Sequence, residues 1–267
     1  MNNFRLAALV TLAAASSMFS SLASAAPVEL DLPACEREVV VTTPIHFFVE
    51  LKVRENRDIV TQIRNDIGMA NTVLENSCIP MRRKLGSVTY VEIDERFMLN
   101  LGWVHFGLEQ FIGQDKIASI KNEPNVYYGV VLSDDSGYFA GIQEGQTARS
   151  EFEQFFILSE SADELTLEHE LGHLAWAEHD PATLAEQLDS DLEDTTPAWD
   201  LDKLKSYARG ALCGNAGTVM SYQDNILPIY SSPDFYYQKY KCGDSNRADN
   251  ARVLTEYAYD LASQLKQ

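Results

Sequence analysis

One segment constrains the rest of the chain: Glu168 to Asp180, which reads E-H-E-L-G-H-L-A-W-A-E-H-D and holds three of the five histidines. His169 and His173 are four residues apart, so a helix places them one turn apart on the same face. This spacing allows two imidazoles to bind one metal ion, while Glu170 between them offers a carboxylate to act on water at the metal. His179 follows six residues after His173 and reaches the same ion only if the chain turns back.

The residues around these histidines predict how the helix begins and which side it buries. Ser161 and Glu164 have the spacing of a capping box, with Ser161 as the N-cap. Leucines recur on a face nearly opposite the histidines, at Leu167, Leu171 and Leu174. We therefore expect the leucines to pack in a core and the histidines to face a cleft. The alternative, two buried histidines without a metal, leaves polar rings that need other partners.

The first 25 residues have the pattern of a secretory signal peptide. Arg5 is their one charge, an apolar run follows, and the small residues Ala23-Ser24-Ala25 end the segment. A membrane anchor is the alternative, but serines from position 16 onward make the run shorter than the roughly 20 residues that span a bilayer. We expect cleavage after Ala25 and a mature chain that is periplasmic or secreted, with no membrane span.

Length and charge limit the remaining possibilities. Removing the signal leaves 242 residues (267 minus 25), which suit a single domain over 26–267. The net charge is −19, or −20 without Arg5. Nucleic acids and anionic membranes bind basic surfaces, so neither is an expected partner. Oligomeric state is not indicated.

Four cysteines in an exported chain predict two disulfides. They fall in two neighbourhoods of the sequence, which favours Cys35–Cys78 and Cys213–Cys242. The other two connectivities stay open.

Hydrophobic patterning predicts an α/β fold, with strands alternating with helices in the N-terminal half. We expect strands at 38–51, 78–93, 125–133 and 155–158, with Pro44 near an edge or a bulge. Helices are expected at 56–76, in part of 97–120, at 201–212 and at 247–267. The acidic segment 180–202 is interpreted as a solvated loop or surface helix.

The other two histidines, His46 and His105, fall in these predicted elements and are interpreted as structural. Asp134 to Gly137 is interpreted as a plain turn, because it lacks the full spacing of a calcium loop.

Taken together, these residues resemble the metzincin clan of zinc endopeptidases, most closely its reprolysin-like (adamalysin-like) branch. The clan's pattern is H-E-x-x-H-x-x-G-x-x-H, followed later by a methionine turn. The chain matches it at His169, Glu170, His173 and His179, and His179-Asp180 reproduces the H-D ending of that branch.

The methionine turn has a counterpart in T-V-M-S-Y, where Met220 lies 41 residues after His179. Tyr222 then matches the M-x-Y form of astacin-like and serralysin-like members, in which the tyrosine can reach the metal. The resemblance extends loosely over most of the mature chain.

One position departs from the pattern. Trp176 stands where the clan has the glycine that lets the helix turn, and a non-glycine residue with positive φ costs about 1–2 kcal/mol. If His179 does not reach the metal, a downstream carboxylate such as Glu186 or Glu193 is the alternative third ligand.

The resemblance implies a metzincin-like fold. Its mixed, mostly parallel sheet and long active-site helix would form an N-terminal subdomain (26–179), followed by a smaller, mainly helical or irregular C-terminal subdomain (180–267). Substrate would run antiparallel to an edge strand within 140–159. The wall of the S1′ pocket would come from 226–232, where Ile226, Leu227 and Ile229 would favour an apolar side chain.

The resemblance also implies a function, that of a secreted zinc endopeptidase with one catalytic Zn²⁺ and a peptide or protein substrate. Glu170 would be the general base and Tyr222 a hydrogen-bond donor to the developing oxyanion. The alternative is an exported zinc-binding protein without proteolytic activity, a binding or adhesion module. Trp176 is the one feature that favours this alternative, and the presence of Glu170 argues against it.

Overall fold

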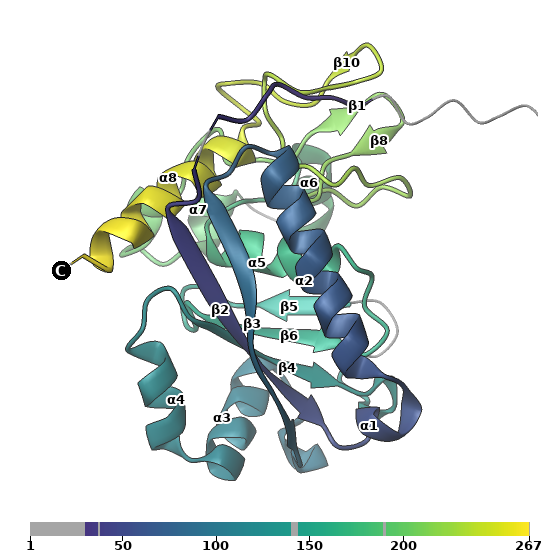
Figure 1. Cartoon of the computed structure of the whole chain (residues 1–267), viewed down its shortest axis with the longest axis vertical. Helices are drawn as coiled ribbons and strands as arrows, with labels where there is room; N and C mark the ends of the chain where they lie inside the picture. Colours follow the sequence, from purple (N-terminus) through teal and green to yellow (C-terminus); the bar gives the residue numbers. More distant parts are fainter. Residues whose placement is uncertain (1–29, 37, 140–143, 189–190, 267) are drawn as a thin grey trace, which may run out of the picture.

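The computed structural model describes residues 30–36, 38–139, 144–188 and 191–266. The expected signal peptide, Met1–Ala25, lies outside the described residues. Figure 1 shows a twisted central sheet with helices on both faces and the C-terminal segments gathered at one end. Within the described ranges, no helix is both long enough and apolar enough to cross a membrane.

The central sheet has five strands in the order β3-β2-β4-β6-β5. Their bounds are β2 Val41–Glu50, β3 Met81–Val91, β4 Tyr127–Leu132, β5 Gly145–Thr147 and β6 Phe155–Ser159. Strand β2 runs parallel to β3 and β4, and β4 runs parallel to β6. Strand β5 is antiparallel to β6 and forms one edge of the sheet. The predicted mixed, mostly parallel sheet is therefore confirmed.

Different helices cover the two faces of this sheet. The main helices are α2 Ile59–Asn76, α3 Leu101–Ile112, α4 Gln114–Lys121 and α5 Thr166–Leu174. Successive side chains of a strand point to opposite faces. Phe156 of β6 therefore packs with α2 and α5, whereas its neighbour Phe155 packs with α3 and α4. The face of α5 that joins this core is the predicted leucine face: Leu167, Leu171 and Leu174.

Two details of the interior strands follow from single residues. Pro44 lies in β2, which has neighbours on both sides, and the register with β3 shifts directly afterwards, between Ile45 and His46. The predicted bulge is therefore present next to Pro44, although β2 is not an edge strand. The His46 Nδ1 lies 2.8 Å from the Ser87 Oγ of β3, a cross-strand contact.

Helix α5 differs from expectation at both ends. Its N-cap is Leu165 rather than Ser161, and the Ser161 Oγ lies 3.0 Å from the Ser159 Oγ instead. The Glu144 carboxylate lies at the start of the helix, where it accepts hydrogen bonds from the Asp163 N–H at 2.8 Å and the Thr166 hydroxyl at 2.9 Å. The capping-box prediction is wrong because a distant segment supplies the acceptor. The expected long active-site helix is also wrong, since α5 has nine residues.

Shorter elements complete the chain. They are β1 Leu30–Asp31, α1 Val53–Asn56, η1 Glu95–Phe97, η2 Asp134–Ser136, α6 Pro181–Gln187, α7 Leu192–Thr195, η3 Leu201–Lys203, β7 Leu212–Cys213, β8 Ala216–Gly217, β9 Tyr236–Tyr237, β10 Tyr240–Lys241 and α8 Asn250–Gln264. The helix predicted at 201–212 is wrong beyond residue 203. Tertiary partners take its backbone groups, since Gly210 N–H donates to the Glu178 carbonyl and Ala211 N–H to the Thr218 hydroxyl.

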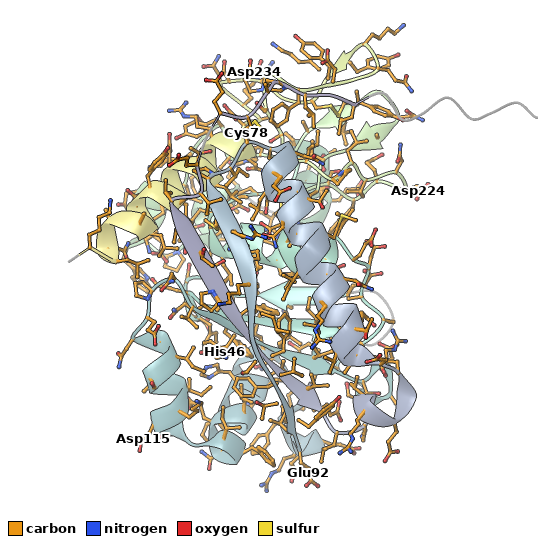
Figure 2. The ribbon with its side chains drawn as sticks, viewed as in Figure 1. His46, Cys78, Glu92, Asp115, Asp224 and Asp234 are labelled. Carbon is orange, nitrogen blue, oxygen red and sulfur yellow. A yellow bond between two sulfur atoms is a disulfide. The ribbon has the colours of Figure 1, made fainter. Side chains whose placement is uncertain are left out.

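Two disulfides join segments that lie far apart in the sequence. The structure bonds Cys35 to Cys78 and Cys213 to Cys242, with Cα–Cα distances of 5.2 and 4.9 Å. These are the pairs favoured by the sequence. Figure 2 shows Cys78 near the C-terminal segments, at the end of α2. The first bond thus fixes the N-terminal segment beside the C-terminal part of the fold.

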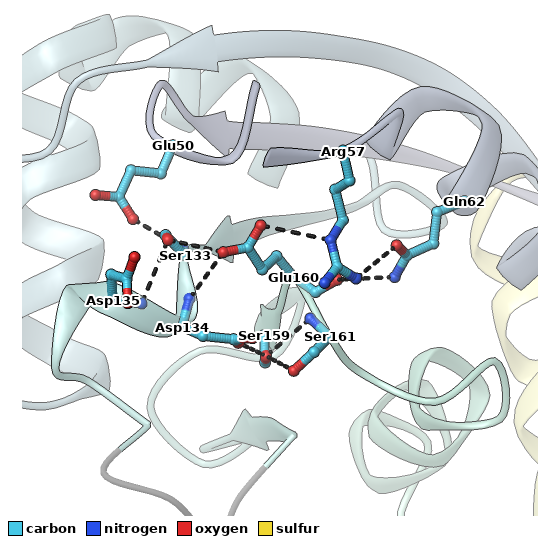
Figure 3. Close-up of polar contacts among 9 residues, drawn as sticks. All are labelled: Glu50, Arg57, Gln62, Ser133, Asp134, Asp135, Ser159, Glu160 and Ser161. Atoms are coloured by element: carbon cyan, nitrogen blue, oxygen red, sulfur yellow. Dashed lines mark hydrogen bonds and ion pairs between the residues drawn. The ribbon is translucent and has the colours of Figure 1, made fainter. Parts of the chain in front are cut away.

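A polar cluster lies at the carboxyl ends of β2, β4 and β6 (Figure 3). We call it the strand-end cluster and define it by Glu50, Arg57, Ser133, Asp134 and Glu160. One Glu160 oxygen accepts from the Ser133 hydroxyl at 2.7 Å and from the Asp134 N–H at 3.1 Å, and the other lies 3.5 Å from the Arg57 Nε. The Glu50 carboxylate accepts from the Ser133 N–H at 2.9 Å. Each carboxylate here faces donors of the protein itself.

Candidate metal centre

Three imidazoles converge at the end of α5. His169 and His173 come from the helix and His179 from the segment after it. The Nε2 of His179 lies 3.0 Å from the Nε2 of His169 and 3.0 Å from that of His173. Together they form the one group of metal-ligating side chains found in the described ranges, and neither Glu186 nor Glu193 belongs to it.

Each imidazole is oriented by a bond at its other nitrogen. The Nδ1 of His169 lies 2.8 Å from the Val219 carbonyl, and that of His173 lies 3.0 Å from the Ala177 carbonyl. A carbonyl oxygen only accepts, so both Nδ1 atoms carry the proton. The Nδ1 of His179 donates to the Gln187 Oε1 at 2.7 Å. The tautomers therefore leave three Nε2 lone pairs facing one another.

This arrangement fits a divalent metal ion. The His179 lone pair lies 3.0 Å from each of the other two, and such lone pairs repel one another unless a cation lies between them. The spacing is close to the roughly 3.3 Å that tetrahedral Zn–N bonds of about 2.0–2.1 Å require. Burial lowers the pKa of His169 to about 3, and it also lowers the pKa values of His173 and His179. All three rings are thus neutral at pH 7, which is the form that binds metal.

The turn that brings His179 back is formed by a tryptophan. Trp176 has φ of +68°, the left-handed conformation that favours glycine. Its N–H donates to the His173 carbonyl at 3.0 Å, and the Ala177 N–H donates to the Gly172 carbonyl at 3.0 Å. These two bonds form a Schellman motif with Trp176 at the position that glycine usually takes. A left-handed turn is therefore present at residue 176 although no glycine stands there.

Met220 lies against the helix beneath the histidines. Its side chain is fully buried, and a Cβ at Gly172 would come within 3.0 Å of its sulfur and 2.7 Å of the Tyr230 hydroxyl. Only glycine permits this approach. The Met220 carbonyl also accepts from the Asp180 N–H at 3.1 Å, which joins this segment to the residue after His179.

A buried ion pair supports α5 from behind. The guanidinium of Arg83 in β3 donates to both oxygens of Glu168, at 2.9 and 3.0 Å, and both side chains are completely buried. The Tyr230 hydroxyl lies 2.9 Å from the Glu168 carboxylate. Glu168 immediately precedes His169, so this network sets the rotation of the helix.

Glu170 lies between α5 and the edge strand. It is 6% exposed, and burial raises the pKa of its carboxyl to about 8, against a hydrogen bond to Thr147 that lowers it. A group that exchanges its proton near neutral pH suits acid–base catalysis. A Cβ at Gly145 in β5 would come within 2.6 Å of its Oε1. The edge strand thus passes directly over this carboxyl group.

Tyr222 lies at the mouth of the site. It is 61% exposed, and its ring stacks on His169 with centroids 5.7 Å apart. Gln187, which accepts from His179, also hydrogen-bonds the Tyr222 side chain. One amide therefore connects the third histidine to the tyrosine.

A cleft of about 530 Å³ opens beside the histidines and Glu170. Ile226 lines it, whereas Leu227 and Ile229 are buried in the core of the C-terminal part. The prediction that all three form an apolar wall is therefore wrong for the last two. Carboxylates instead contribute to the lining, from Glu144, Asp163 and Asp224. Asp224 projects at the outer edge of the molecule (Figure 2).

The remaining histidine, His105, lies elsewhere, as expected. It is 5% exposed in α3, and its Nε2 lies 2.7 Å from the Tyr128 hydroxyl. Several supporting residues were not identified from the sequence: Arg83, Arg149, Glu178, Gln187 and Tyr230. Two of these lie near His179 in the sequence: Glu178 directly precedes it, and Gln187 follows eight residues later on the next helical segment. No sequence pattern indicates the role of either residue.

Comparisons with known proteins bear on the fold alone. No protein-family model and no curated protein matches the sequence. One similar solved structure is a chain from a chaperone–substrate complex, 15% identical with a TM-score of 0.57, over 83% of this chain and 34% of that one. Another is metalloproteinase-II from Bacteroides fragilis, 16% identical with a TM-score of 0.45, over 86% of this chain and 56% of that one. The chain thus spans about a third and just over half of their lengths.

Proposed function

We propose that this chain is a zinc-dependent endopeptidase, exported to the periplasm or beyond the cell. The observation that carries the proposal is the convergence of three neutral imidazoles beside a buried carboxyl group, under an open sheet edge. His169, His173 and His179 would hold one Zn²⁺. When bound, zinc supplies a Lewis acid that polarises the scissile carbonyl and lowers the pKa of water toward about 7.

The chain's own groups would perform the remaining steps. The free edge of β5 offers backbone N–H and C=O groups to an extended peptide, which would lie across Glu170. Glu170 would take a proton from the attacking water and pass it to the leaving amine, a role for which its buried position between α5 and the edge strand is suited. Tyr222 would donate a hydrogen bond from its hydroxyl group to the developing oxyanion.

Two further parts of the proposal concern organisation. The division at His179 would separate an N-terminal subdomain, which carries the sheet and α5, from a C-terminal subdomain that carries the methionine turn. The two disulfides support export, because such bonds persist in oxidising compartments.

The decisive experiment compares the wild type with Glu170→Gln. Metal analysis should find one zinc per chain in both proteins, because the carboxyl group is not a ligand. Cleavage of a broad peptide library, read by mass spectrometry, should fall by about 100- to 10,000-fold in the variant. Equal cleavage by both proteins would contradict the proposed endopeptidase, in which Glu170 is the general base. Zinc binding without cleavage by the wild type would favour the alternative, an exported zinc-binding module.

A further inference from the structure

Arg149 follows β5 by two residues and contacts three groups around the end of α5. Its guanidinium carbon lies 4.1 Å from the centre of the Trp176 ring, and its Nη2 pairs with the Glu178 carboxylate. Its Nη1 donates to the His173 carbonyl at 3.5 Å. The Arg149 and Glu178 side chains are 15% and 5% exposed, so the pair is largely shielded from water. These contacts lie on both sides of residue 176.

The turn at Trp176 needs support of this kind. A residue with a Cβ disfavours the φ of +68° observed there, whereas glycine adopts it freely. A right-handed or extended residue 176 would direct Glu178 and His179 away from His173. The three contacts of Arg149 are made together only when the turn is left-handed.

Glu178 is held from its other side as well. Its carbonyl accepts from the Gly210 N–H at 2.9 Å and from the Asn250 Nδ2 at 3.0 Å. The backbone of residue 178 is thus fixed by the C-terminal segments and its side chain by Arg149. The next residue is His179, so the position of the third imidazole depends on both anchors.

We propose that Arg149 is a positioning residue that substitutes for the missing glycine. By stacking on Trp176 and pairing with Glu178, it holds the left-handed turn that places the His179 Nε2 beside those of His169 and His173. The Trp176 side chain therefore contributes to the support of its own turn, because its ring provides the surface on which the Arg149 guanidinium stacks. The inference rests on the metal centre of the proposed function but not on peptide cleavage.

A double-mutant cycle on zinc affinity tests this. Arg149 and Glu178 are changed together, as R149M/E178Q, so that no buried charge is left unpaired. The pair variant is made in the wild type and in Trp176→Gly, and zinc affinity is measured by competition with a chelator. We expect a loss of about 10- to 100-fold in the wild type, in the range of other supporting groups of metal sites. In Trp176→Gly, where the turn no longer needs support, we expect a loss below about threefold.

The proposal is tested by comparing the loss of zinc affinity in the wild-type and Trp176→Gly backgrounds. Equal losses in the two backgrounds, or no loss in the wild type, would overturn the proposal. If the pair variant does not fold in the wild-type background, the same comparison is made on apo-protein folding by circular dichroism. Recovery of a cooperative unfolding transition on adding W176G would then support the proposal, and failure to recover would overturn it.

Lys203 provides the matched control. Its Nζ lies 5.2 Å from the centre of the same Trp176 ring, but it pairs with Asp200 and Glu153, outside the turn. We expect Lys203→Met to change zinc affinity by less than about twofold, since a single exposed cation–π contact is weak. A loss equal to that of R149M/E178Q would show that Lys203 supports the turn as much as Arg149 does, and would overturn the specific role of Arg149.

Peptide cleavage, measured on the same proteins, separates this inference from the proposed function. If the loss of zinc affinity depends on residue 176 but the wild type cleaves no peptide, the positioning role is supported and the endopeptidase is rejected. If the wild type cleaves peptides but the loss is the same in both backgrounds, the endopeptidase is supported and the positioning role is rejected.

Discussion

Two groups of polar side chains in the described part of the chain, the strand-end cluster and the three histidines, differ in how their hydrogen-bonding atoms are satisfied. The strand-end cluster lies at the carboxyl ends of parallel strands, where open α/β sheets usually bind ligands. There, however, Glu50 and Glu160 accept hydrogen bonds from Ser133 and Asp134, and the Glu160 carboxylate forms an ion pair with Arg57. In the histidine cluster, every Nδ1 has an acceptor while the three Nε2 atoms face only one another. The strand-end cluster thus satisfies its own polar groups, whereas the histidine cluster leaves three lone pairs in an arrangement that fits a cation.

The largest expected change in zinc affinity comes from removing the third histidine, and it tests whether the two clusters differ in function. His179→Ala should weaken zinc binding by more than about 100-fold, which exceeds the cost of removing a supporting group. The strand-end control, Glu160→Gln, should leave zinc affinity unchanged and lower the free energy of unfolding, because its carboxylate bonds are weakened. Chelator competition and urea unfolding measure the two. Unchanged zinc affinity in His179→Ala would contradict the three-histidine centre.

A smaller effect tests whether the Nδ1 partners matter. Gln187→Leu removes the acceptor of the His179 Nδ1–H and should weaken zinc binding by about 10- to 100-fold. Gln187→Glu keeps an acceptor in the same place and should restore most of the affinity. The readout is again chelator competition. Equal losses in both variants would mean that the amide only packs and does not orient the imidazole.

The smallest effect uses a carboxyl group outside both clusters. Burial raises the pKa of Asp66 in α2 to about 7, with Glu164 and Asp163 adding to the shift. Below about pH 3 both the folded and unfolded states hold the proton, so Asp66 does not affect stability. As pH rises from about 3 to 7 only the unfolded state loses it, and stability falls until the folded state ionises near pH 7.

Asp66→Asn should therefore be nearly neutral at pH 3 and stabilise the protein by about 2 kcal/mol at pH 8, roughly half of the ~4 kcal/mol that the full shift corresponds to, because solvent screens this partly exposed group. Urea unfolding at the two pH values measures this. A stabilisation that is equal at both would show that the titration of Asp66 is not its cause.

The sequence predicts well what depends on local spacing. Apolar periodicity located α2 and four of the five strands of the central sheet, but not the edge strand β5, and the i, i+4 spacing of His169 and His173 placed two imidazoles together. It fails where a distant segment supplies the partner. Glu144 caps the start of α5 in place of Ser161, and Arg149 supports a turn at Trp176 that sequence alone marks as unfavourable. Such contacts are tertiary, so no local pattern records them.

The missing side chain at Gly145 has a mechanical consequence. The edge strand and the Glu170 carboxyl group touch there with no atom to spare, since even a methyl group would come within 2.6 Å of the carboxyl oxygen. Any side chain at position 145 would therefore push the Glu170 carboxyl group from its place. In this fold the residue chosen for the edge strand, where a peptide would lie, also sets the position of the group that would act on that peptide.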